Sequence, residues 1–143
     1  MNRNRTGTRL RRISRALLLS SCLFALHASA AQPGSDYYED ALRRLDAKDV
    51  KGAIVQLKNA LQQDPNLLTA QVLLSDVYLV TGSAADAETA LEAAAKLGAD
   101  RSVILPKLAQ ALIAQLKYRE VLDRVSPQGL PPFVAAEVLT YRA

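Results

Sequence analysis

Apolar residues recur in this chain with the spacing of one buried helix face. In the segment DVKGAIVQLKNALQQDPN, Ala53, Leu57, Ala60 and Leu61 stand at positions i, i+4, i+7 and i+8, a single stripe on a 3.6-residue period. Two of the four are alanines, whose small side chains let a neighbouring helix come close. Pro65 ends the pattern because proline cannot donate to the helix ladder. The segment therefore predicts a helix packed on more than one side, followed by a turn.

The same pattern returns 34 residues later, which indicates an internal repeat. Each unit combines a first helix with large packing residues and a second helix with small ones. The aligned positions are Ala53 with Ala87, Leu57 with Leu91, Ala60 with Ala94 and, in a weaker third copy, Leu74 with Leu108 and Ala87 with Val121.

These positions resemble the tetratricopeptide repeat. The resemblance rests on Ala53, Leu57, Ala60 and Pro65 in the first unit and on Leu74, Tyr78, Gly82, Ala87, Leu91 and Ala94 in the second. It implies an all-α fold over residues 37–143: a right-handed α-solenoid of antiparallel helix pairs, with about three repeats and a terminal helix. Two departures are Arg44, where a large apolar residue is usual, and Ala99, in place of a closing proline.

Turn and cap residues set the expected helix limits. We expect helices over residues 37–47, from 49 to the turn at 64–66, and over 67–81, 84–97, 102–115, 118–125 and 133–142. Ser35 or Asp36 is expected to cap the first helix. Ser102 is expected to cap the fifth, with Pro106 in its first turn. Gly82 and Gly98 are expected to end helices in the left-handed conformation.

The last expected helix lacks an evident partner. Its apolar residues are Phe133, Val134, Val138, Leu139 and Tyr141, and no later repeat follows to cover them. Repeat arrays normally close with a helix whose outer face is polar. We therefore expect the repeat domain to be truncated relative to a longer array. The alternative is that this helix folds back and caps the stack itself.

Residues 1–30 have the three parts of a secretory signal peptide. They contain six arginines and no acidic residue, then the apolar run 16–26, then Ala28-Ser29-Ala30 as a cleavage site. The apolar run of 11 residues is too short to span a bilayer. We expect cleavage after Ala30, a linker over residues 31–36 and a periplasmic location.

The same segment allows a second interpretation. Leu19-Ser20-Ser21-Cys22 fits the lipobox of bacterial lipoproteins, in which Cys22 becomes the acylated N-terminus. The chain would then be an outer-membrane lipoprotein acting in envelope assembly or quality control, and it would meet a membrane only through that acyl group. Otherwise Cys22 is a residue of a discarded leader.

The leader accounts for the basic charge of the chain. The full chain carries +4, but subtracting the six leader arginines from 18 basic residues leaves 12 against 14 acidic ones, a net charge of −2. No electrostatic footprint for nucleic acid remains. The leader also holds the only Cys and the only His, so the rest of the chain lacks the usual nucleophile, base and metal ligands. We expect no enzyme activity, no cofactor and no metal.

The remaining candidate chemistry is sparse. Asp86, Glu88 and Glu92 lie along one alanine-rich helix, and such a charge run is usually a solvated face. Ser75 stands at a close-packing position and is interpreted as a small spacer.

The resemblance also implies where a partner binds. In tetratricopeptide superhelices the fifth, ninth and twelfth residues of each unit line a concave groove. By register these are Tyr38, Leu42 and Leu45, then Val72, Asp76 and Leu79, then Pro106, Gln110 and Ile113. The set is mostly apolar, so we expect an amphipathic helix or an extended peptide of a protein partner, oriented by Asp76 and Gln110. Tyr38 and Leu42 replace the Lys and Asn of families that clamp a C-terminal carboxylate. The alternative is that these side chains pack on the neighbouring helix.

A narrower resemblance covers about residues 37–143. The segments AIVQLKNALQQDPN, KLGAD and KYREVLD are similar to the N-terminal part of the exported tetratricopeptide protein of the exosortase and PEP-CTERM exopolysaccharide system. This implies a scaffold in exopolysaccharide production or surface-protein sorting, with no catalytic residues to carry over.

Overall fold

The structure, a computed structural model, describes residues 34–143 and contains only helices there. The helices are α1 (Ser35–Asp46), α2 (Val50–Gln63), α3 (Leu68–Val80), α4 (Ala84–Lys96), α5 (Arg101–Ala114), α6 (Tyr118–Arg124) and α7 (Pro132–Arg142). None of these helices is long and apolar enough to cross a membrane. The predicted signal peptide, its cleavage site and Cys22 lie outside the described residues.

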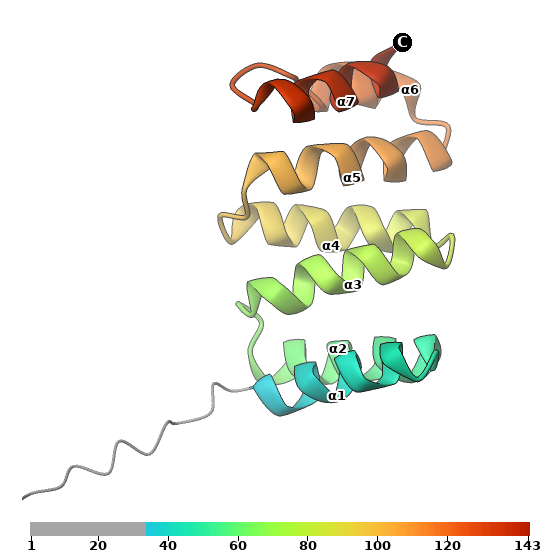
Figure 1. Ribbon diagram of the computed structural model, residues 1–143, viewed down its shortest axis with the longest axis vertical. Coiled ribbons are helices and arrows are strands. Elements are labelled where there is room, and N and C mark those ends of the chain that lie inside the picture. Colours follow the sequence, from blue (N-terminus) through green and yellow to red (C-terminus); the bar gives the residue numbers. More distant parts are fainter. Residues whose placement is uncertain (1–33) are drawn as a thin grey trace, which may run out of the picture. The chain divides into compact units, whose positions relative to one another are not determined.

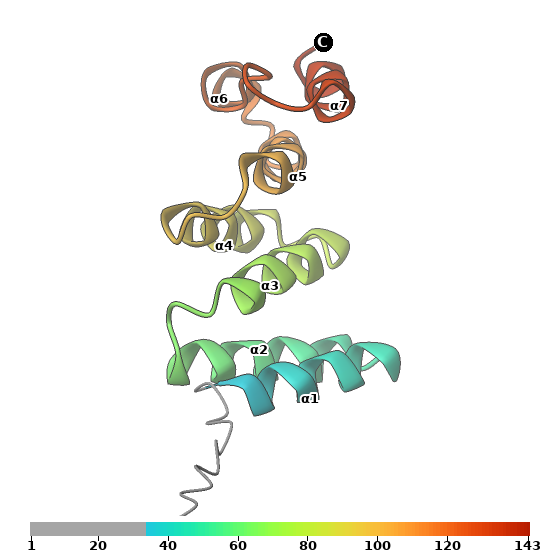
Figure 2. The same cartoon turned by 60° about the vertical axis from the view of Figure 1, so that its left-hand side comes forward.

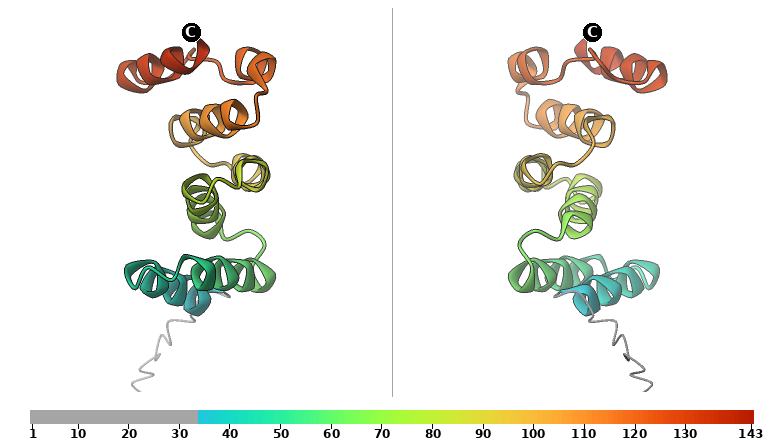
Figure 3. Two further views of the ribbon diagram at one scale, coloured as in Figure 1. Left: turned by 90° about the vertical axis from the view of Figure 1, so that its right-hand side faces the viewer. Right: turned by 90° about the vertical axis from the view of Figure 1, so that its left-hand side faces the viewer.

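The helices stack in chain order, each against its neighbours (Figure 1). α1 pairs with α2, α3 with α4 and α5 with α6, and α7 packs against α5 and α6. The first helices α1, α3, α5 and α7 lie on one side of the stack and the second helices α2, α4 and α6 on the other (Figure 3). This arrangement confirms the predicted all-α solenoid of helix pairs followed by a terminal helix.

Small residues occupy the contacts between helices, as the repeat predicted. Ala53, Ala60, Ala87 and Ala94 are fully buried in the core, whereas Ala85 is exposed. Alanine at these positions lets neighbouring helix backbones approach closely, because no larger side chain separates them. The 34-residue register is therefore confirmed.

The turn inside each helix pair also repeats with this period. Lys48, Gly82 and Leu116 follow α1, α3 and α5, and their φ angles are all positive, at 64°, 77° and 61°. Glycine adopts this left-handed conformation easily, whereas a residue with a Cβ adopts it at a cost of about 1 kcal/mol or more. Since two of the three positions are not glycine, the packing of each pair imposes the turn.

Arg44, the departure from the repeat pattern, ties the first pair together through charge. Its side chain donates to Asp40 and to Asp49, each at 2.8 Å. Asp49 is also the N-cap of α2 and accepts from the Gly52 N–H at 2.9 Å. The hydrogen bond from Gly52 and then the one from Arg44 lower the pKa of Asp49. A Cβ at Gly52 would collide with the Asp49 carboxylate, so glycine makes room for this corner.

The predicted cap of the first helix is wrong. α1 begins at Ser35, two residues earlier than expected, after Gly34 with φ 84°. Neither Ser35 nor Asp36 caps it, because the N-cap position falls on Gly34, which has no side chain. A Cβ at Gly34 would lie 2.5 Å from the Ala60 carbonyl oxygen. Close packing of the chain against α2 therefore requires glycine at this entry.

The predicted start of the fifth helix is also wrong. The N-cap of α5 is Asp100, whose carboxylate accepts from the Ser102 N–H at 2.8 Å. Pro106 is consequently inside the helix, where it is buried, and not in the first turn. Proline there removes the N–H that would normally bond the carbonyl four residues earlier. Burial of the ring against the core offsets part of that loss.

The last helix is covered on one side. Val138 is fully buried, Val134 and Tyr141 are half-buried, and the expectation that nothing covers them is wrong. Arg142 fastens α7 to the end of α6 by donating to the Val125 carbonyl at 2.7 Å. Phe133 and Leu139 remain exposed, as expected.

Candidate functional site

The first helices contact one another through pairs that are 31 residues apart. Asp76 on α3 forms an ion pair with Lys107 on α5. One repeat later, Gln110 on α5 donates to the Tyr141 hydroxyl on α7 at 2.8 Å. These two polar contacts occupy equivalent repeat positions, and they join α3 to α5 and α5 to α7.

The corresponding pair between α1 and α3 is apolar. The same register places Leu42 opposite Leu73, and neither side chain can form a hydrogen bond. We call the region between these two helices the α1–α3 seam. Within residues 34–143, α1 and α3 lack the direct helix contact that joins α3 to α5. In Figure 2, α3 crosses above the α1–α2 pair at a clear angle.

Two clefts open at the α1–α3 seam. The larger has a volume of about 390 Å³ and is lined by Tyr38, Leu68, Thr69, Val72, Leu73, Asp76, Ala99, Asp100 and Val103. The smaller has a volume of about 230 Å³ and is lined by Leu45, Val50, Leu73, Asp76, Val77 and Val80. Leu73 and Asp76 line both, so the two clefts follow one another along α3. Their walls are mainly apolar.

The structure brings only part of the predicted groove together. Tyr38, Val72 and Asp76 line the larger cleft, and Leu45 and Asp76 line the smaller one. The other predicted residues, Leu42, Leu79, Gln110 and Ile113, line neither cleft.

These four residues lie outside the clefts for different reasons. Leu79 and Ile113 are half-buried against the core, which is the alternative that the sequence left open. Leu42 is 39% exposed on α1. Gln110 is held by Tyr141 and Asp76 by Lys107, so neither side chain is free to orient a partner as expected. Pro106 is buried and does not face a groove.

Several cleft residues were missed by the sequence interpretation. Leu68, Thr69 and Leu73 are the first, second and sixth residues of their unit, and Ala99 and Asp100 belong to the α4–α5 loop. The register considered three positions of each first helix and no loop. The Leu42 and Leu73 pair, apolar where the later units are polar, is the signal that points to this seam.

Asp100 provides a fixed negative charge at the edge of the larger cleft. The hydrogen bond from the Ser102 backbone N–H, followed by the one from its hydroxyl, lowers the pKa of Asp100. The carboxylate is therefore ionised at neutral pH while it caps α5. In the part of the chain that the structure describes, no group of three or more His, Cys, Asp or Glu side chains is placed to hold a metal ion.

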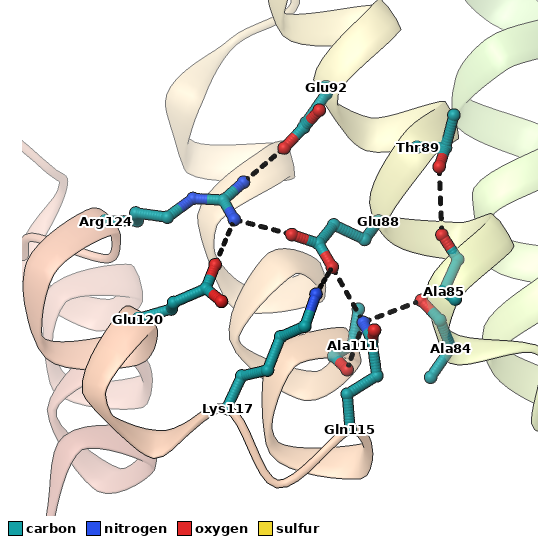
Figure 4. A network of polar contacts seen from close by, with 10 residues as sticks. All are labelled: Ala84, Ala85, Glu88, Thr89, Glu92, Ala111, Gln115, Lys117, Glu120 and Arg124. Carbon is teal, nitrogen blue, oxygen red and sulfur yellow. Dashed lines mark hydrogen bonds and ion pairs between the residues drawn. The ribbon is translucent and has the colours of Figure 1, made fainter.

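A polar cluster joins the second helices α4 and α6 (Figure 4). Glu88 accepts from Lys117 at 2.7 Å, from Gln115 at 2.8 Å and from Arg124 at 2.5 Å. Arg124 also pairs with Glu92 at 2.6 Å and with Glu120 at 2.7 Å. The prediction of a solvated acidic face is therefore wrong for Glu88, which is only 8% exposed. It holds for Asp86, which is exposed.

The charge of Glu88 is stabilised by its partners. Burial opposes ionisation, but hydrogen bonds from Lys117, Arg124 and Gln115 outweigh it and lower the pKa of Glu88 to about 2. Bonding to Glu88 in turn raises the pKa of Lys117. A carboxylate that stays ionised and accepts several hydrogen bonds cannot deliver a proton at neutral pH, so this cluster has the chemistry of a structural clamp. Ser75 is equally occupied, because its hydroxyl donates to the Val72 carbonyl at 2.6 Å.

Comparison with known proteins assigns the repeats. The sequence matches the family described as Tetratricopeptide repeat over residues 44–116, just over half of the chain. Comparison with curated proteins finds no significant match. Repeats of this kind generally serve as non-enzymatic scaffolds that bind other proteins. The family match, the 34-residue period and the stacked helix pairs together show that the chain belongs to the tetratricopeptide repeat family.

Proposed function

We propose that the α1–α3 seam is the site at which this scaffold binds a protein partner. The observation that carries this proposal is that both clefts open at the seam where the polar pair of the later repeats is replaced by leucines. Ion pairs and hydrogen bonds join α3, α5 and α7 to one another. The seam lacks such a contact and presents apolar walls that a solenoid does not need for its own stability.

The shape of the seam favours an elongated apolar segment as the occupant. Along α3, the larger cleft runs from Leu68 to Asp76 and the smaller one from Leu73 to Val80. A single segment lying along α3 can place one apolar side chain in each cleft. Both an amphipathic helix and an extended peptide present side chains with such a spacing. The ionised Asp100 disfavours a partner that presents a carboxylate there.

Shortening one side chain in each cleft is expected to weaken partner binding. The Tyr38→Ala, Val80→Ser double variant removes a wall of the larger cleft and a wall of the smaller one. Val80 is 85% exposed, so its loss should leave the fold intact. Truncating an apolar anchor typically costs more than about 1 kcal/mol, so we expect the two changes together to lower affinity by about tenfold or more. The measurement is capture from an envelope extract, followed by titration with the captured protein.

A matched control is the Tyr118→Ala, Val55→Ser variant. These residues are also exposed, at 58% and 54%, but they lie on α6 and α2 outside both clefts. Equal capture by wild type and control, with loss in the cleft variant, supports the seam. Equal capture by all three proteins would remove the seam from consideration.

We also propose that the protein is exported and acts in the bacterial cell envelope. Support comes from the arginine-rich start, the apolar run and the Ala28-Ser29-Ala30 site in residues 1–30. The lipobox Leu19-Ser20-Ser21-Cys22 supports an alternative, an outer-membrane lipoprotein in envelope assembly or quality control. The similarity of AIVQLKNALQQDPN, KLGAD and KYREVLD to the exosortase-associated family supports a role in exopolysaccharide production or PEP-CTERM protein sorting.

Mass spectrometry of the protein recovered from its host distinguishes the two forms of export. We expect the mature chain to begin at Ala31, because Ala28-Ser29-Ala30 has the small residues that signal peptidase requires. A chain that begins at an acylated Cys22 would establish the lipoprotein form. A chain that retains Met1 would contradict export by either route.

A further inference from the structure

The outward side of α7 is an apolar surface without charge. Its exposed side chains are Pro132, Phe133, Ala136, Leu139, Thr140 and the adjoining Ala143. At 100° per residue they fall within an arc of about 120°, roughly opposite the buried Val138. Phe133 is 82% exposed and Leu139 53% exposed. We call this arc the α7 face.

The α7 face is distinct from the α1–α3 seam. α6 and α7 form the end of the described stack, and α7 packs on α5 through its opposite side (Figure 2). By comparison, the exposed residues of α1 include Asp36, Glu39, Arg43 and Asp46, and those of α4 include Asp86, Glu92 and Lys96. A terminal helix that exposes two large apolar side chains and no charge has the composition of an interface core, from which charged residues are depleted.

We propose that the α7 face binds the α7 face of a second copy of this chain. In a two-fold dimer each surface must be compatible with itself. A charged face would bring like charges together, whereas this uncharged face meets its copy without repulsion.

The order of side-chain sizes also suits a pair of antiparallel copies. With the two-fold axis at Val138, the bulky Phe133 of one copy stands opposite the small Ala143 of the other. Ala136 then stands opposite Thr140, and Leu139 lies beside the Leu139 of the second copy. Small residues opposite large ones allow two helices to approach closely.

The size of the α7 face sets the strength of this contact. A helix of 11 residues is about 16 Å long, which is short beside the interfaces of permanent dimers. Leu122 on α6 is half-exposed and its carbonyl accepts from Arg142 at 3.0 Å, so it extends the apolar surface next to α7. We therefore expect a reversible dimer whose population rises with protein concentration.

The test is the oligomeric state of the full chain, measured by sedimentation over a dilution series. Wild type is expected to pass from the monomer mass to twice that mass as concentration rises. Leu139→Glu and Leu139→Lys are each expected to raise the dissociation constant by about tenfold or more, because both place like charges beside each other at the two-fold axis. An equimolar mixture of the two variants is expected to recover dimers, because a carboxylate then meets an ammonium group.

Val55→Glu is the matched control, since Val55 has nearly the same exposure as Leu139, at 54%, but lies on α2. Thermal melts of all variants check that each is folded. A wild-type chain that stays monomeric at every concentration would overturn the proposal. So would equal dimerisation by Leu139→Glu and wild type, which would place the contact elsewhere in the chain, or a failure of the mixed variants to recover dimers.

Discussion

The Ala94→Leu variant is expected to unfold at a clearly lower temperature than wild type. Ala94 is fully buried on α4, which packs against both α3 and α5. A leucine there adds three carbon atoms to a contact that has no free space, so neighbouring side chains and helices must move apart. Overpacking of this kind costs about 1–3 kcal/mol. Ala60→Leu is expected to act similarly, since Ala60 is fully buried at the equivalent position of α2.

Ala85→Leu provides the control for this prediction. Ala85 lies on the same helix as Ala94 but is exposed, so an added side chain there meets solvent. We expect its stability to stay within about 0.5 kcal/mol of wild type. Thermal melts followed by circular dichroism measure all three variants. Equal losses for Ala85→Leu and Ala94→Leu would contradict the repeat register.

The architecture could be predicted because its determinants are local and repeated. Apolar residues on a 3.6-residue period define each helix, and the return of Ala53 and Leu57 as Ala87 and Leu91 identifies the stacked pairs. Every one of these four side chains is fully buried. The same period also placed the left-handed turn at Gly82, although its recurrence at Lys48 and Leu116 has no sequence signature.

The errors arise where residues distant in the sequence determine the local structure. Ser35 was expected as a cap because serine commonly fills that role, yet contact with Ala60 places Gly34 at the N-cap. Glu88 was assigned to a solvated face because alanines surround it on its own helix. Its partners Lys117 and Arg124 stand 29 and 36 residues later, and only the stacking of α6 on the array brings them near.

The candidate site was predicted in part for the same reason. Repeat register correctly placed Tyr38, Val72 and Asp76 near one surface, because it describes the regular part of the array. The clefts, however, follow an irregularity, the opening between α1 and α3, which involves Leu73 and the α4–α5 loop. A pattern averaged over repeats cannot show where one seam differs from the next.

The Glu88→Gln variant is expected to be less stable than wild type at neutral pH and equally stable near pH 2. Glutamine keeps the shape of the side chain but removes the charge that Lys117 and Arg124 stabilise. The pKa of Glu88 is about 2 in the folded protein against 4.5 for an ordinary glutamate. That difference corresponds to about 3 kcal/mol of stability, taken as an order of magnitude. Urea unfolding at a series of pH values measures the difference between the two proteins.

The pH window follows from the direction of this pKa change. Above pH 4.5 Glu88 is ionised in both the folded and the unfolded chain, and the folded state has the full benefit of the cluster. As the pH falls from 4.5 to about 2, the unfolded chain binds a proton first, so the stabilisation is lost across this interval. Other carboxylates titrate in both proteins, and their effects cancel in the difference between wild type and Glu88→Gln. Asp86→Asn removes an exposed carboxylate from the same helix and should leave that difference near zero at every pH. If the gap between wild type and Glu88→Gln stays constant from pH 7 to pH 2, the ionised Glu88 is not what clamps α4 to α6.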